Sequence, residues 1–183
     1  AEAGLRRGAA GGHLTKAKAL GHQTRRLRKG GRARRLAIGC ACQWLHIRDF
    51  DQFDEKNERL YPEFTKLRGS MYEESIRFFT DFFRNNRSIL SLLEADHVFV
   101  DAELARFYDL PEPAAGWHRV GDTKKSGRGG ILGFATTLAR QSGASRTSPI
   151  LRGNWVSETL LGERLPKPPK DVPQLPEIGR AHV

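Results

Sequence analysis

Cysteine is scarce in this sequence of 183 residues, which contains only Cys40 and Cys42, separated by a single residue. Covalent attachment of haem needs a C-x-x-C-H motif, and a structural zinc site usually draws on two paired clusters of Cys or His ligands. Neither pattern occurs, so the sequence predicts no metal site and no attached haem in this stretch. Free cysteines are commonly buried, and we expect both to pack on an apolar helix.

Long hydrophobic runs are also missing. No stretch reaches the roughly 18 consecutive apolar residues that indicate a membrane-spanning helix. The glycine- and lysine-rich stretch 124–130 lacks the residue order of a phosphate-binding P-loop. Hydrophobic residues nevertheless make up 38% of the chain, which is enough to build a folded core. These features predict a folded module with no membrane span and no nucleotide motif.

Acidic residues are nearly absent from the first 35 residues, which hold 11 Lys or Arg and a single acid, Glu2. The remaining residues hold 20 basic and 20 acidic side chains, so the whole net charge of +10 belongs to this stretch. A basic stripe can bind the phosphates of nucleic acid, and residues 6–35 are the candidate. No aromatic residue lies there to stack on bases, so a solvated helix face is the preferred interpretation.

Helical periodicity is the strongest signal in the rest of the chain. In residues 65–86, apolar side chains such as Met71 and Phe78 recur at spacings of three and four, which is typical of a buried helix face. Glu73 and Glu74 lie near this stripe; solvent-facing carboxylates are the expectation, and a general acid is the alternative. Further helices are expected over 13–29, 32–47, 88–93, 102–108, 131–140 and 149–161, with 1–12 loose, a turn at 94–97 and a short strand at 117–120.

A change in composition at 111–116 predicts a domain boundary. We expect a mostly α fold in which a helical domain, residues 1–110, is followed by a smaller, loop-rich helical domain, residues 111–177. Five prolines between 165 and 176 predict an extended tail. Residues 178–183, Ile-Gly-Arg-Ala-His-Val, are the translation of a widely used sequencing adapter. We therefore expect them to be an artefact and the chain to be a fragment of a larger protein.

Several ordered motifs carry a resemblance to a known family. Residues 41–45, 60–64, 71–79 and 86–99 resemble the domain of unknown function 1592. Residues 129–132 and 146–156 resemble the adjoining domain of unknown function 1588, and the proline-rich residues 166–176 follow as in that family. The resemblance covers residues 10–177. The chain departs from the family at Asp101, where Asn is frequent, and at Gly133-Phe134, where a polar residue is common.

The resemblance implies a large exported protein of the kind typical of planctomycetes, located in the periplasm or cell envelope. Such proteins often carry a c-type cytochrome domain on the N-terminal side, so any haem c would belong to sequence outside these residues. No activity is established for either domain. The first hypothesis is therefore a non-catalytic module, a scaffold or docking surface that packs against neighbouring domains such as the cytochrome.

An enzyme of unknown reaction is the second hypothesis. A histidine beside a carboxylate can perform general acid–base chemistry if the two side chains converge. Asp96, His97, Asp101 and His118 are the polar candidates for such a site. His97 also has a purely structural interpretation, as a core histidine close to Phe99.

Two arginines flank the start of the helix that Ser148 and Pro149 predict. Arg146 precedes this helix and Arg152 lies in its first turn, an arrangement that can bind a carboxylate or a phosphate. Together with His97 they would form the polar site of an enzyme. The preferred alternative is a salt bridge to Asp96 or Glu94 that ties the two domains together.

Overall fold

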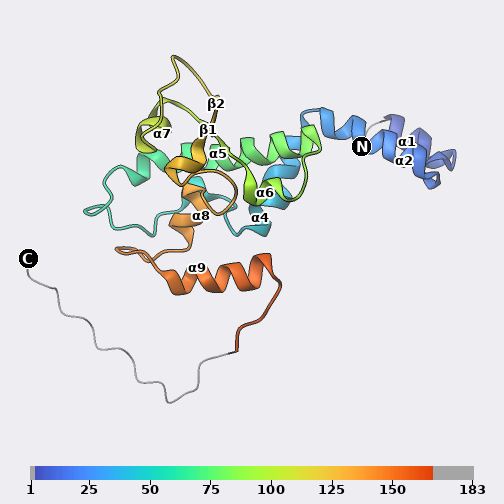
Figure 1. Ribbon diagram of the computed structural model, residues 1–183. Coiled ribbons are helices and arrows are strands. Elements are labelled where there is room, and N and C mark those ends of the chain that lie inside the picture. Colours follow the sequence, from blue (N-terminus) through green and yellow to red (C-terminus); the bar gives the residue numbers. More distant parts are fainter. Residues whose placement is uncertain (1–2, 167–183) are drawn as a thin grey trace, which may run out of the picture.

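The computed structural model describes residues 3–166 and shows a mostly helical chain with one small sheet (Figure 1). Its α-helices are α1 (Ala3–Ala10), α2 (Ala17–Lys29), α3 (Arg32–Leu36), α4 (Cys42–Trp44), α5 (Phe64–Asn85), α6 (Ser91–Glu94), α7 (Ala102–Phe107), α8 (Ala135–Arg140) and α9 (Pro149–Trp155). Shorter 3-10 or π-helical segments are η1 (His13–Thr15), η2 (Ala37–Ala41), η3 (Phe50–Gln52), η4 (Thr123–Ser126) and η5 (Val156–Leu160). The expectation of a mostly α fold is thus confirmed.

Helix α5 is the centre of the core. It contacts η2, η3, α3, α7, α8 and the first strand, and its apolar stripe is buried as its spacing predicts. The ring of Phe134, just before α8, packs edge-on against Phe78 and Phe79, with centroid distances of 5.0 and 6.2 Å. One hydrophobic cluster therefore extends from the residues around α4 to Trp155 of α9.

The sheet has two short antiparallel strands, β1 (His97–Val100) and β2 (His118–Gly121), with His97 opposite Gly121 and Val100 opposite His118. The expected strand at 117–120 corresponds to β2, whereas the expected turn at 94–97 ends in β1. Val98, Phe99 and Val100 are three apolar residues in a row, so alternation could not identify this strand. Burial of Val98 and Val100 against the core fixes the strand instead.

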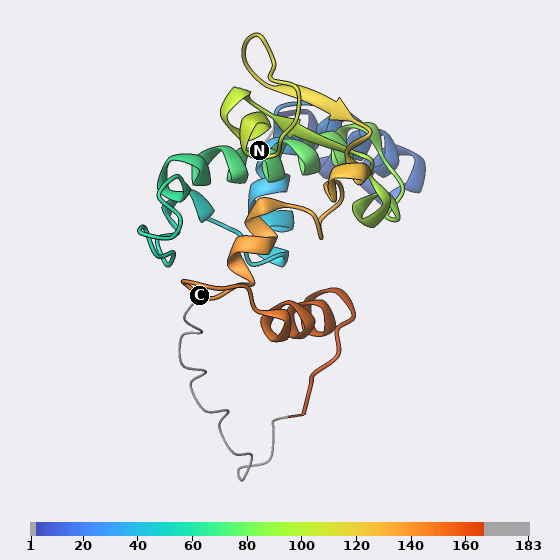
Figure 2. The same cartoon turned by 60° about the vertical axis from the view of Figure 1, so that its left-hand side comes forward.

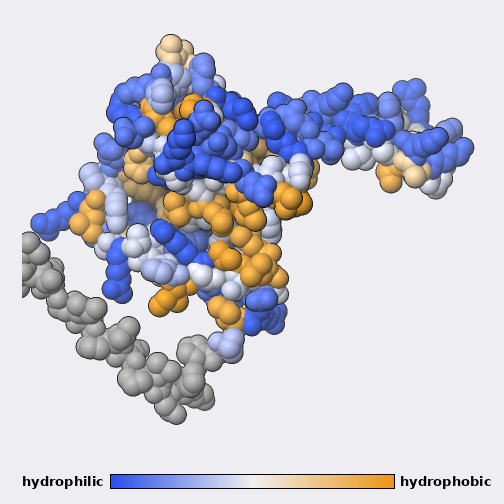
Figure 3. Space-filling view, viewed as in Figure 1, coloured by the Kyte–Doolittle hydropathy of each residue, from blue (hydrophilic) through white to orange (hydrophobic). Residues whose placement is uncertain are grey.

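The expectation of a loose N-terminus is wrong, because Ala3–Ala10 form α1. Alanine has the highest helix propensity of all residues, and it outweighs the glycines there. Neither α1 nor α2 contains a buried residue. Figures 1 and 3 show the two helices as a hydrophilic arm that extends from the body of the molecule.

The expected helix over 32–47 is present from Arg32 to Trp44, but its middle, η2, is π-helical. Single-turn π segments are rare and interrupt the regular ladder, and Gly39 lies within this one. Ala37, Ala41 and Cys42 are buried, whereas Cys40 is exposed. The expectation that both cysteines are buried therefore holds only for Cys42.

Helix α8 begins at Ala135, four residues later than expected, because glycines hold a tight turn in front of it. Gly130 has a φ of 63°, and a Cβ there would lie 2.7 Å from the carbonyl oxygen of Leu93. The amide of Ile131 donates to the carbonyl of Leu92 at 2.7 Å. This turn fastens the chain before α8 against α6, and a residue with a side chain would push the two backbones apart.

Two indole groups attach α9 and the following η5 to the end of α4. Trp155 Nε1 donates to the carbonyl of Leu45 at 3.2 Å, and Trp44 Nε1 donates to that of Thr159 at 3.0 Å. Ser148 caps α9, as expected, by accepting from the amide of Leu151. Figure 2 shows α9 below the rest of the molecule, joined to it through α8. The proline-rich tail from 167 onward and residues 178–183 lie outside the described residues.

Candidate functional site

A cavity of about 280 Å³, here called the central cavity, lies where α5, α7, α8 and α9 approach one another. Its apolar wall consists of Phe64, Met71, Phe107, Ala135, Leu138 and Ala139. An adjoining cavity of about 330 Å³ shares Tyr61, Phe64, Met71 and Phe107 with it and continues to Leu60, Pro62, Leu67 and one carboxylate, Glu63. Mostly apolar clefts with a few fixed polar groups are the usual form of small-molecule sites.

Three cationic side chains line the central cavity, each from a different segment: Lys56, Arg128 and Arg152. The ammonium of Lys56 donates to the carbonyls of Ser142 and Gly143 and to the Ser142 hydroxyl, at 2.8 to 3.0 Å. Partial burial lowers the pKa of Lys56. Within residues 3–166, the charged side chains that line this cavity are these three cations.

A buried carboxyl group lies behind this wall and corrects the expectation that Glu74 faces solvent. Glu74 is 0% exposed, and Tyr108 Oη donates to its Oε2 at 2.6 Å. Burial raises the pKa of Glu74 to about 8, although the Tyr108 hydrogen bond and the charge of Arg128 act in the opposite direction. Glu74 is therefore a neutral acid at pH 7.

Tyr108 joins this carboxyl to the second part of the chain. Its hydroxyl accepts from the amide of Ala135 at 3.3 Å, and the Arg128 guanidinium lies 4.0 Å from the centre of its ring. Glu74 comes three residues after Met71 and four before Phe78, which places it on the buried face of α5. That spacing is the sequence signal that could have identified Glu74.

His97 is a core side chain. It is 5% exposed and stacks on Phe78, with ring centres 5.4 Å apart. Burial lowers the pKa of His97 to about 4, helped by the charges of Arg119 and Arg87, so the imidazole is neutral at pH 7. Asp96, its neighbour, is exposed and accepts from the backbone amide of Lys124 at 2.8 Å. His97 thus lies in the core and Asp96 at the surface, so the two side chains do not converge on one site.

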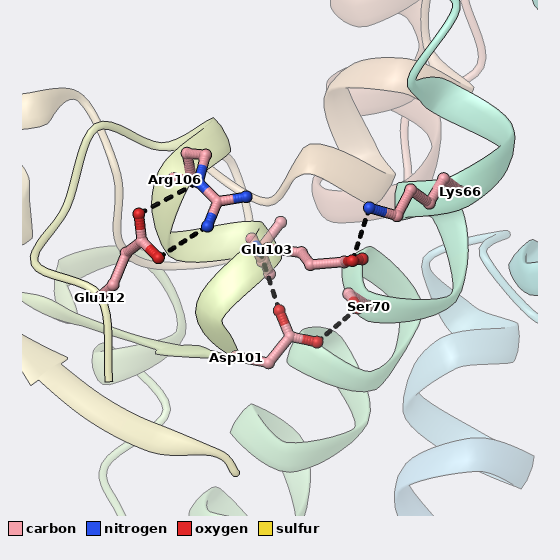
Figure 4. Close-up of polar contacts among 7 residues, drawn as sticks. Lys66, Ser70, Asp101, Glu103, Arg106 and Glu112 are labelled. Carbon is pink, nitrogen blue, oxygen red and sulfur yellow. Dashed lines mark hydrogen bonds and ion pairs between the residues drawn. The ribbon is translucent and has the colours of Figure 1, made fainter. Parts of the chain in front are cut away.

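Asp101 and His118 have local structural contacts. Asp101 caps α7 by accepting from the Leu104 amide at 2.8 Å, and its other oxygen accepts from Ser70 Oγ of α5 at 2.5 Å (Figure 4). The cap is the role that its position predicts. His118 is exposed on β2, with Nε2 2.8 Å from the carbonyl of Ala115. Within residues 3–166, neither side chain forms a hydrogen bond with His97.

The two arginines differ. Arg146 is exposed, whereas Arg152 is half-buried, lines the central cavity, and has a buried Nε without a hydrogen-bond partner among the described residues. Within residues 3–166, neither arginine forms an ion pair with Asp96 or Glu94. The structure thus offers no support for that salt bridge.

Among the described residues, no group of three His, Cys, Asp or Glu side chains could hold a metal ion. The same part of the chain contains no helix with the length and apolar character needed to cross a membrane. Sequence reasoning singled out Arg152 but missed Lys56 and Arg128, because only the tertiary fold brings these three cations to one cavity.

Comparison with protein families now places the chain. Residues 2–110 match the model described as a protein of unknown function, DUF1592 (PSD4), and residues 128–182 match that of another, DUF1588 (PSCyt3). Comparison with the curated proteins finds no match, and comparison with the solved structures finds none either. The resemblance expected from the sequence is thus confirmed. This chain belongs to the DUF1592 family of proteins of unknown function, and its second part matches the DUF1588 model.

Proposed function

We propose that this chain is a non-catalytic docking module that packs against another domain of its parent protein. The observation behind this proposal is an exposed group of apolar side chains, the α6 patch, which consists of Ile89, Leu90, Leu93 and Leu132. Their exposed fractions range from 46% to 67%, and Figure 3 shows apolar surface around α6. Exposed apolar patches mark interaction sites on soluble proteins.

Rigidity of the α6 patch supports the same role. The amide of Ile131, next to Leu132, bonds to Leu92 of α6, and Leu92 itself is buried in the core. The exposed side chains are therefore held on a fixed surface, which lowers the entropy cost of binding. A c-type cytochrome domain is the partner we propose, since proteins resembling this chain often carry one. Haem c would come with that domain, and the assembly would lie in the cell envelope.

The docking role predicts slower amide exchange in the parent protein. Long-read sequencing of the source DNA would supply the whole gene for expression. We expect backbone amides of residues 89–93 to exchange at least about tenfold more slowly in the parent than in this chain, because a docked domain shields α6. Hydrogen-exchange mass spectrometry would measure this. In the parent protein, the double variant Leu90→Ser, Leu93→Ser should lose this difference in exchange rate. Ile150→Ser is the control and should keep the difference, because Ile150 is 82% exposed on α9, away from the patch. Equal exchange in parent and chain would refute docking at the α6 patch.

The basic arm supports a second candidate, nucleic-acid binding. Helix α2 carries Arg26, Arg28 and Lys29 in its last turn, and the arm extends away from the body (Figure 3). Contacts of this kind depend on phosphate charge. A protein that makes about six to ten of them loses about a thousandfold or more in affinity for DNA between 50 and 200 mM salt.

Deleting residues 1–29 tests the arm. Since α1 and α2 bury no residue, we expect the deletion to change the free energy of unfolding by less than about 1 kcal/mol. Any binding to a DNA duplex at 50 mM salt should disappear in the same variant. Thermal melting and fluorescence anisotropy provide the two measurements. Binding that persists without the arm would exclude it as the nucleic-acid site, and a large loss of stability would show that it belongs to the core.

A further inference from the structure

The central and adjoining cavities form one elongated site. They share the side chains of Tyr61, Phe64, Met71 and Phe107, so a bound molecule can extend from one to the other along α5. Two of these shared rings are partly open to solvent, since Tyr61 is 42% and Phe107 46% exposed. A ligand that covered them would remove apolar surface from water, which is favourable by about 25 cal/mol per Å².

Positive charge is confined to the central cavity. Lys56 contributes its charge, but its three donors are already used by Ser142 and Gly143. Arg128 uses Nη1 in a bond to the carbonyl of Gly133 at 3.2 Å, which leaves other donors of its guanidinium. Arg152 lines the cavity, and its guanidinium has no hydrogen-bond or ion-pair partner within residues 3–166. Charge-assisted hydrogen bonds to a carboxylate are among the strong ones, so Arg152 is the group that an anionic ligand would engage.

From this asymmetry we infer that the paired cavities bind a long-chain anionic amphiphile, in the first instance a fatty-acid-like carboxylate. Its carboxylate lies at Arg152 and Arg128, and charge-assisted hydrogen bonds from guanidinium groups hold it there. Its hydrocarbon chain follows Met71 and Phe64 into the adjoining cavity. The site is separate from the α6 patch, so this inference goes beyond the proposed docking function.

Both halves of the ligand are needed to explain the lining. A small hydrophilic anion such as phosphate would leave Leu138, Ala139 and the other apolar walls in contact with water. A neutral chain such as an alcohol would leave the charges of Lys56, Arg128 and Arg152 without a counter-charge, since no carboxylate of residues 3–166 lines this cavity. An amphiphile with one negative end matches both features.

Isothermal titration of the whole chain with sodium laurate, below its critical micelle concentration, tests the inference. We expect one laurate per chain, with Arg152→Gln weakening the affinity by at least about tenfold. Arg146→Gln is the matched control, because it removes the same charge from an exposed position outside the cavity. This control should bind laurate with the affinity of the unsubstituted chain. Arg152→Lys, which keeps the charge, should bind more tightly than Arg152→Gln.

A second variant keeps the test valid if Arg152→Gln fails to fold. Ala139→Phe fills the central cavity without changing charge and should abolish laurate binding; thermal melting confirms that each variant is folded. Dodecanol and inorganic phosphate are the comparison probes, and both should bind much more weakly than laurate. The inference is overturned if laurate does not bind, if either comparison probe binds equally well, or if Arg146→Gln weakens laurate binding as much as Arg152→Gln.

Discussion

Raising the pH from about 6.5 to 8 should lower the free energy of unfolding by about 1 kcal/mol. Glu74 is the cause. Its pKa is raised from an ordinary value of 4.5 to about 8, chiefly by burial. The folded protein therefore keeps a proton that the unfolded chain has already lost. A group whose pKa is raised on folding contributes its full stabilisation below its pKa in the unfolded chain. That contribution is lost as the pH rises through its pKa in the folded protein.

His97 acts in the opposite direction at lower pH. Burial and the charges of Arg119 and Arg87 depress its pKa from 6.5 to about 4. Between these two values the imidazole of His97 is protonated in the unfolded chain but not in the folded protein. The contribution of His97 to stability is therefore lost as the pH falls from 6.5 toward 4. Between about 4.5 and 6.5 the two slopes oppose each other, each at most about 1.4 kcal/mol per pH unit. We expect a nearly level stability profile in that range and the decline only above it.

Thermal melting from pH 4.5 to 8.5 measures this profile. Glu74→Gln keeps an acceptor for Tyr108 and removes the titrating proton, so its melting temperature should rise between pH 4.5 and 6.5 and stay level above. The matched control is Glu73→Gln on the preceding residue of α5, whose carboxylate is partly exposed and paired with Arg34 and Arg77. The melting temperature of this control should fall above pH 6.5 as it does in the unsubstituted chain. If Glu74→Gln and the unsubstituted chain show the same dependence on pH, Glu74 does not hold the proton.

Local signals in the sequence identified the helices but could not reveal the site. The period of the apolar residues in α5, the cap at Asp101 and the cap at Ser148 all depend on residues within a few positions of one another, and each is confirmed. The spacing within α5 could place Glu74 on the buried face, but the hydrogen bond that its carboxyl accepts comes from Tyr108, which lies 34 residues further along the chain. No local pattern reports a partner at that separation.

The central cavity illustrates the same limit. Its three cations come from the loop before α5, the glycine turn before α8, and α9, and each is unremarkable within its own segment. Arg146 and Arg152 looked equivalent because both flank the start of α9. Helix geometry separates them: the first turn of α9 directs Arg152 toward the cavity, whereas Arg146 stays in the exposed loop. Only the tertiary structure could therefore show that Arg152 lines the cavity and that Arg146 does not.

Phe134→Ala should cost about 3 to 5 kcal/mol, the usual range for deleting a buried aromatic ring. Phe134 is 0% exposed and packs against both Phe78 and Phe79 of α5. The ring belongs to the DUF1588-matching segment and inserts into the core of the DUF1592-matching one. Its loss would create a cavity at the junction of the two segments.

Urea unfolding followed by circular dichroism measures this loss, with Phe107→Ala as the control. Phe107 has the same ring but is 46% exposed, so its removal should cost clearly less, about 1 kcal/mol. Equal shifts of the two midpoints would show that Phe134 does not hold the segments together. A selective loss in Phe134→Ala would mean that α8, and with it one wall of the central cavity, is positioned by this contact. Laurate binding should then weaken in Phe134→Ala even under conditions where the variant remains folded.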